Sequence, residues 1–221
     1  MSFETFSFSG GVTLVGGGAA SIGLIEKAME FAPALVAADG GANGLSAAGI
    51  TPEAIIGDLD SLEDAQAWRG RLGDRVRHIA EQNSTDFEKC LYSIDAPFFI
   101  GVGFLGGRVD HELAALSAML AEPRPVLLIG EQDVVFAPPQ DVTLHLQRGD
   151  RVSIMPMRPV RATGAGLKWP LDALPLAPGE RVGSSNEATG GPVRLAFDTP
   201  GAIIVLDRRR LPQAMRALSL P

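Results

Sequence analysis

Short apolar runs that alternate with helical patterns along the first part of the chain constrain its fold most. The runs are rich in β-branched residues and cover residues 12–15, 34–38, 54–56, 98–104 and 126–129. Helical patterns fill the intervals at 22–31, 42–48, 86–92 and 110–121. The third of these begins with the capping box Thr85-Asp86-Phe87-Glu88, in which Thr85 is the cap. Strands that alternate with helices predict a parallel sheet covered on both faces.

After residues 137–140 the pattern changes to short β-prone segments separated by turns that contain Gly or Pro. These segments cover 142–146, 151–155, 181–184, 193–197 and 202–206. A spacing of about ten residues between turns is typical of a sandwich or a barrel. We therefore predict an α/β N-terminal domain with a parallel, Rossmann-like sheet over 1–139, followed by a smaller all-β, sandwich-like C-terminal domain over 140–221.

The composition excludes several classes of protein. A net charge of −7 and a pI near 5.0 argue against a surface for nucleic acid or an anionic membrane. A single cysteine, Cys90, excludes an internal disulfide, and His78, His111 and His145 lack the spacing of zinc ligands. No apolar run approaches the ~20 residues that span a bilayer. Residues 1–4 lack the basic start of a signal peptide, so we expect a cytoplasmic protein.

Two carboxylates separated by one residue follow the third apolar run, in the sequence Gly57-Asp58-Leu59-Asp60-Ser61. In extended backbone, positions i and i+2 point to the same side, so Asp58 and Asp60 should face a common point. Like charges at this range repel unless a cation lies between them or one carboxylate is protonated. Oxygen ligands at a strand end suit Mg²⁺, which keeps part of its shell for water and substrate phosphates. The same residues also suit an ordinary turn.

Other polar residues follow the ends of the predicted strands, at the edge of an open parallel sheet where ligands bind. Asp39 ends the second strand, Arg108 and Asp110 follow the fourth, and Asp86 begins a helix that should open on the same side. Each has a local explanation as a cap or a turn residue. Together with the acid pair they favour a complex of metal and polyphosphate, because Mg²⁺ cancels carboxylate charge and arginine binds phosphate.

Two further stretches admit more than one interpretation. The loop Gly16-Gly17-Gly18 resembles part of a dinucleotide fingerprint, but Ser21 stands where the third glycine is expected, which disfavours a nicotinamide or flavin site. In the second domain Trp169 suits either packing or stacking on a flat ring, and packing is the commoner role of a tryptophan. Ser185 and Asn186 suit either turn positions or contacts to a ligand.

Six motifs, in order along nearly the whole chain, resemble the thiamine pyrophosphokinase family. They are DGGA at 39–42, GDLDS at 57–61, TDFEK at 85–89, GGRVDH at 106–111, GLKW at 166–169 and SN at 185–186. The resemblance implies a nucleotide-binding α/β domain, a β-rich domain for thiamine binding and dimerisation, and a homodimer with active sites between subunits. The reaction it implies is Mg²⁺-dependent transfer of pyrophosphate from ATP to the hydroxyl of thiamine, which yields thiamine diphosphate and AMP.

The resemblance also implies roles for single residues. Mg²⁺ would be held by Asp58, Asp60 and Asp86. ATP would contact Asp39, Gly40, Gly41 and Arg108. Catalysis would involve the three metal-binding carboxylates together with Arg108 and Asp110. The thiamine ring would stack on Trp169, near Ser185 and Asn186.

Some positions depart from the family pattern. A charged stretch is common in the family where this chain has Gln82-Asn83-Ser84, and an asparagine is common at Ala115. Either Asp86 or Asp110 would take the proton of the thiamine hydroxyl. Two alternative functions stay open: a pyrophosphokinase for another heterocyclic alcohol, such as a pterin, and a non-catalytic nucleotide-binding regulator.

Overall fold

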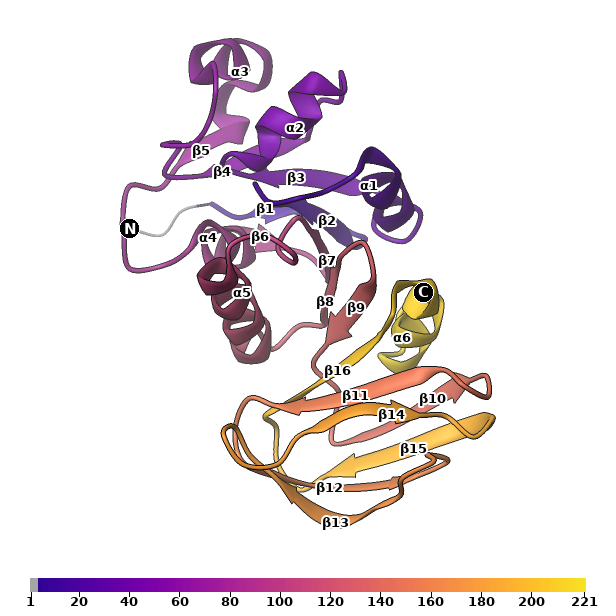
Figure 1. Cartoon of the computed structure of the whole chain (residues 1–221). Helices are drawn as coiled ribbons and strands as arrows, with labels where there is room; N and C mark the ends of the chain where they lie inside the picture. Colours follow the sequence, from indigo (N-terminus) through magenta and orange to yellow (C-terminus); the bar gives the residue numbers. More distant parts are fainter. Residues whose placement is uncertain (1–3) are drawn as a thin grey trace. The chain divides into compact units, whose positions relative to one another are not determined.

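The computed structural model describes residues 4–221 and divides into two units, Met1–Glu131 and Gln132–Pro221 (Figure 1). The predicted domain boundary after Pro139 lies within the second unit, between its first two strands. In the part of the chain that the structure describes, no helix has the length and apolar character needed to cross a membrane.

Parallel strands form the sheet of the first unit. The described strands are β1 (Phe6–Ser7), β2 (Val12–Val15), β3 (Ala34–Ala38), β4 (Ala54–Gly57), β5 (Val76–His78), β6 (Ile94–Asp95), β7 (Phe99–Val102) and β8 (Val126–Ile129). β7 pairs with β2 and β8, and β4 pairs with β3 and β5, all in parallel. β2 and β3 lie side by side, and β1 pairs with β6. Every residue of β2, β4, β7 and β8 is buried, as expected for a parallel sheet.

Helices connect these strands. They are α1 (Ile22–Met29), α2 (Gly41–Ala47), α3 (Ala65–Leu72), α4 (Asp86–Ser93) and α5 (Val109–Ala121), with a 3₁₀ turn at Gly73–Arg75. α1 packs on β2 and β7, α2 packs on β3, and α4 packs on β3 and β4. α4 begins with the predicted capping box, because the Thr85 hydroxyl accepts from the Glu88 N–H while the Glu88 carboxylate accepts from the Thr85 N–H.

The second unit is built from antiparallel strands and a C-terminal helix. Its elements are β9 (Asp133–Phe136), β10 (Asp141–Leu146), β11 (Arg151–Pro156), β12 (Val160–Ala165), β13 (Leu171–Leu176), β14 (Gly183–Glu187), β15 (Gly191–Phe197), β16 (Ala202–Asp207), a 3₁₀ turn (Arg208–Arg210) and α6 (Leu211–Ala217). Antiparallel pairs join β14, β11, β16 and β9 in that order, and join β10, β15, β12 and β13 in a second sheet. Burial alternates strictly along β10 and β12, so each has one core-facing side.

The sequence-based boundaries were wrong at some elements. The run at 98–104 yields only Phe99–Val102, because Gly103 has a φ of 79° and turns the chain. The segment expected at 181–184 begins instead at Gly183 and extends to Glu187. β12 and β13 were not anticipated, because β12 contains Gly164 and β13 contains Pro175, and Gly and Pro are poor strand residues.

Candidate active site

A cavity of about 780 Å³ lies in the first unit, where β2, β3, β4 and β7 end. Strand ends bring the predicted polar residues to this edge, as the ligand-binding rule for parallel sheets requires. The polar residues that line the cavity include Asp39, Asp58, Asp60, Asp86, Lys89 and Arg108. The glycine loop 16–18 and Gly40 also line it, whereas Gly41 and Asp110 are not among its lining residues.

Asp58 and Asp60 converge through a turn and not through extended backbone. β4 ends at Gly57, and Leu59 has a φ of 62°, in the left-handed region. The Asp60 N–H donates to Asp58 Oδ1 at 3.4 Å, and the Ser61 hydroxyl donates to Asp60 Oδ1 at 2.9 Å. The two carboxylates therefore do approach each other, but the extended geometry expected from their spacing was wrong.

Asp39 joins these two carboxylates in one group. Single oxygens of Asp39, Asp58 and Asp60 lie within 4.8 Å of one another. Asp39 is only 2% exposed, its Oδ2 accepts from the Ser61 N–H at 3.1 Å, and its buried Oδ1 has no hydrogen-bond partner among the described residues. Three hard oxygen donors, one of them buried and unpartnered, fit a divalent cation such as Mg²⁺. The family resemblance implies instead that Asp39 contacts the nucleotide.

Burial raises the pKa of Asp39 to about 6. The negative charges of Asp86, Asp58 and Asp60 act in the same direction, while the hydrogen bond from the Ser61 N–H opposes them. Asp58 behaves differently: partial burial alone would raise its pKa, but hydrogen bonds from Gln82 and Lys89 lower it below the usual range. The neighbouring acids are thus held in different protonation environments.

Lys89 is a residue of this site that the sequence analysis did not assign. Its Nζ lies 3.2 Å from Asp58 Oδ2 and 3.1 Å from Asp86 Oδ1. Burial alone would lower the pKa of Lys89, but the hydrogen bonds and charges of Asp86 and Asp58 outweigh it and raise the pKa. Its position three residues after Asp86, on one face of a helix, was the available signal.

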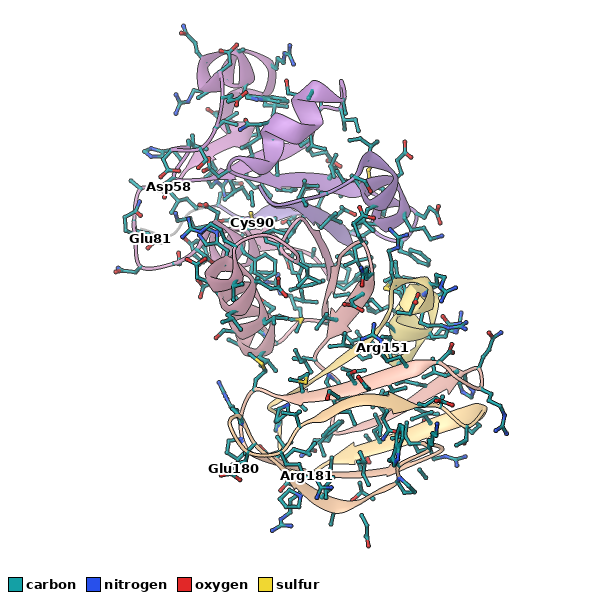
Figure 2. The ribbon with its side chains drawn as sticks, in the orientation of Figure 1. Asp58, Glu81, Cys90, Arg151, Glu180 and Arg181 are labelled. Carbon is teal, nitrogen blue, oxygen red and sulfur yellow. The ribbon has the colours of Figure 1, made fainter. Side chains whose placement is uncertain are left out.

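The segment Gln82-Asn83-Ser84, which departs from the family pattern, is ordered by Glu81. The Glu81 carboxylate accepts from the Asn83 N–H at 2.7 Å, from the Ser84 N–H at 3.2 Å and from the Tyr92 hydroxyl at 3.0 Å. This arrangement presents Gln82, whose Nε2 donates to Asp58 Oδ2 at 2.9 Å. Figure 2 shows Asp58 and Glu81 close together at one edge of the first unit.

Arg108 and Asp110 form an exposed ion pair, with Nη2 2.6 Å from Oδ2. Arg108 lines the cavity while Asp110 does not. Gly41 has a packing role, because a Cβ built there would lie 2.0 Å from the Val15 carbonyl oxygen. Only glycine allows α2 to begin this close to the end of β2.

The predicted thiamine-binding residues lie in the second unit. Trp169, between β12 and β13, is 55% exposed, with Lys168 Nζ 4.9 Å from the centre of its ring. Asn186 is buried: its Nδ2 donates to the Trp169 carbonyl at 2.7 Å, and its Oδ1 accepts from the Trp169 N–H at 3.2 Å. Ser185 has a φ of 57°, and its N–H donates to Ser153 Oγ at 3.0 Å. Trp169 is therefore not a core residue, and Asn186 holds its backbone.

Comparisons with known proteins match both units of the chain. The family model of the thiamin pyrophosphokinase catalytic domain matches residues 25–127, and that of the thiamin pyrophosphokinase vitamin B1 binding domain matches residues 140–201. The chain belongs to the thiamine pyrophosphokinase family. The resemblance drawn from the six motifs is confirmed, and the catalytic-domain match includes the four acids of the cavity.

Several members of the family are similar to this chain. Thiamine pyrophosphokinase 1 of Oryza sativa subsp. japonica is 28% identical over 167 residues, which cover 67% of this chain and 63% of that protein. The solved structure of thiamin pyrophosphokinase from Geobacillus thermodenitrificans is 26% identical with a TM-score of 0.69, covering 89% of this chain and 96% of that one. The enzyme from Candida albicans shares the fold at 16% identity, with a TM-score of 0.76 and coverage of 92% and 93%. The chain spans 63% and 58% of the length of the two rice relatives.

Proposed function

We propose that this chain is a thiamine pyrophosphokinase that transfers the pyrophosphoryl group of ATP to the hydroxyl of thiamine, forming thiamine diphosphate and AMP. The observation that carries the proposal is the meeting of Asp39, Asp58 and Asp60 in a cavity of the unit that the catalytic-domain model matches. Phosphoryl transfer depends on positioning and on charge neutralisation, which acids, a metal and an arginine supply.

The carboxylates around the cavity would hold Mg²⁺. Asp58 and Asp60 supply oxygens in both the sequence-based assignment and the observed cluster, while Asp39 and Asp86 are the further candidates. When bound, the metal supplies shielding of the charge on the attacking and leaving oxygens. Arg108, exposed at the cavity edge, is free to turn from Asp110 to a phosphate, since bidentate arginine suits both groups.

Asp86 is the better candidate for the base that takes the proton of the thiamine hydroxyl. It lines the cavity, whereas Asp110 does not and is paired with Arg108. A base must come within hydrogen-bond reach of the proton that it accepts, which favours the carboxylate on the cavity wall.

The second unit is proposed to bind thiamine and to dimerise. The match to the vitamin B1 binding domain and the exposed ring of Trp169 support stacking on the thiamine ring, with Asn186 acting through the Trp169 backbone. This match favours thiamine over a pterin as acceptor, and the acidic cavity favours an enzyme over a regulator. We further propose that a Rossmann-like first domain and a sandwich-like second domain meet near residue 139. We also propose that the chain forms a homodimer with shared active sites.

The test incubates the purified protein with ATP, Mg²⁺ and thiamine and separates the products by chromatography. Equal amounts of AMP and thiamine diphosphate are expected, with neither formed when thiamine or Mg²⁺ is omitted. Formation of ADP with thiamine monophosphate would contradict pyrophosphoryl transfer. Release of AMP without thiamine diphosphate, or equal turnover with a hydroxymethyl pterin, would contradict the proposed acceptor.

A further inference from the structure

Lys89 is a cation buried inside an acidic cluster. Its side chain is almost fully buried, although lysine is among the residue types most rarely found in the interior. An ammonium group loses its hydration on burial, and ion pairs and hydrogen bonds must offset that cost. The location of Lys89 is therefore maintained by its partners, and its two partners both face the cavity.

The ammonium joins two carboxylates from different elements. Asp58 follows β4, while Asp86 begins α4. The Asp58 N–H also donates to Asp86 Oδ1 at 3.3 Å, and Gln82 shares Asp58 Oδ2 with Lys89. Lys89 thus occupies the position between two acids that would otherwise repel each other.

The remaining charges around the cavity stay uncompensated. Asp39 Oδ1 has no hydrogen-bond partner among the described residues, and the Asp60 carboxylate accepts from the neutral Ser61 hydroxyl. Of the lysine and arginine side chains that line the cavity in residues 4–221, Arg108 pairs with Asp110 at the exposed edge and Lys89 alone is buried. One internal positive charge therefore offsets part of a fourfold negative charge.

We propose that Lys89 is a positioning residue that acts as an internal counter-cation, holding Asp58 and Asp86 together so that the acidic site is preformed before a divalent cation arrives. The inference rests on the proposed metal-binding role of the cluster. In this arrangement a divalent cation and the Lys89 ammonium offset the same excess of negative charge. Without Lys89 the protein should depend on the divalent cation for its stability.

The test is thermal unfolding without ATP or thiamine, in a chelator and in excess MgCl₂. Lys89→Met is compared with Lys27→Met, which removes an exposed ion pair to Glu30 that has the same i, i+3 spacing. In the chelator, Lys89→Met should lower Tm by roughly 10 °C, while Lys27→Met should shift it by about 2 °C or less. MgCl₂ should restore at least half of the loss in Lys89→Met and have a smaller effect on the unmodified protein.

A charge-balanced variant separates charge from packing. Lys89→Met/Asp86→Asn removes the lysine together with one of its acids, so in the chelator its Tm should lie above that of Lys89→Met. Should Lys89→Met not fold in the chelator, folding of the double variant or of Lys89→Met in MgCl₂ supports the proposal. A decrease in Tm that neither MgCl₂ nor Asp86→Asn reduces would overturn the proposal. A decrease in Tm no larger than that of Lys27→Met would also overturn it. Because no nucleotide or acceptor is present, absence of pyrophosphoryl transfer in the unmodified protein would leave these results unchanged and would contradict only the proposed function.

Discussion

At the residue scale, Asp39 shows how the fold changes the chemistry of a carboxyl group. The left-handed φ of 43° turns this residue into the cavity, where it is buried beside three other acids. Its pKa is raised to about 6 from its usual value of 3.8. Between these two values the folded state binds more protons at Asp39 than the unfolded state, so the contribution of Asp39 to the free energy of unfolding falls as the pH rises and levels off above about 6.

Asp39→Asn should therefore stabilise the protein at pH 8 in the absence of divalent cations, by up to about 3 kcal/mol. Asparagine keeps the acceptor for the Ser61 N–H and removes the buried charge. The gain should vanish below about pH 4, where both states are protonated, as measured by urea unfolding at the two values of pH. Asp172→Asn, at an exposed position of β13, is the control. An equal gain at both values of pH would contradict the argument.

Asp60 tests the metal assignment with least disturbance of the fold. Asp60→Asn should lower turnover by about 10²-fold, or roughly 3 kcal/mol of transition-state stabilisation, with Tm unchanged. Asp58→Asn should lose both turnover and stability, because it leaves Lys89 short of one partner. Steady-state kinetics and thermal unfolding on both variants check this. Near-normal turnover of Asp60→Asn at saturating Mg²⁺ would argue that this carboxylate does not hold the metal.

At the element scale, α2 shows how closely a helix and a strand end must approach to build the cavity. Gly41 at its start leaves no room for a Cβ, whereas Gly44 in its interior has no atom within 4 Å of the position that a Cβ would take. The same helix thus contains one glycine required by packing and one that only lowers helix propensity.

Gly41→Ala should destabilise the protein by about 1–3 kcal/mol, because the added methyl forces the backbone apart. Gly44→Ala should stabilise it by about 0.5–1 kcal/mol through helix propensity. Urea unfolding of the two variants measures both changes. Effects of the same sign would show that the separation between α2 and the end of β2 does not limit substitution.

The segment that carries Trp169 is held by Asn186 on the neighbouring β14. If this hydrogen-bonded pair positions the ring for thiamine, Asn186→Ala and Trp169→Ala should each raise the KM for thiamine a few-fold and leave the KM for ATP unchanged. The double variant should be no worse than Trp169→Ala, because Asn186 acts through the tryptophan. Additive effects would instead place Asn186 in direct contact with thiamine.

At the scale of the whole molecule, the chain separates its proposed chemistry between two units. The carboxylates belong to the first unit and the exposed tryptophan to the second. Two-fold dimers are the commonest closed assembly, and a shared active site would let the first unit of one chain work with the second unit of its twin.

Mixing the Asp60→Asn and Trp169→Ala chains tests this arrangement. After subunit exchange, about half of the dimers are mixed and each of those has one site free of both defects. At thiamine concentrations well below KM, where Trp169→Ala sites are slow, activity should therefore rise by up to about a quarter of the normal rate. Light scattering should give the mass of a dimer. A monomeric mass, or no gain in activity after exchange has been demonstrated, would contradict shared sites.

The sequence by itself determined the features that depend on neighbouring residues. The apolar runs at 12–15 and 126–129 became the strands β2 and β8 with the same bounds, and the Thr85 capping box formed as expected, because burial preference and capping act within a few residues. The parallel sheet could be predicted from the alternation of such local strand and helix patterns, and the family from six short motifs.

Only the tertiary structure decided which groups come into contact and how strongly each is desolvated. β12 and β13 owe their strands to pairing partners, the acid pair converges through a left-handed Leu59, and the buried ammonium of Lys89 finds Asp58 from another element. Such outcomes depend on contacts between residues far apart in the chain and on desolvation, and no local pattern of residues contains either quantity.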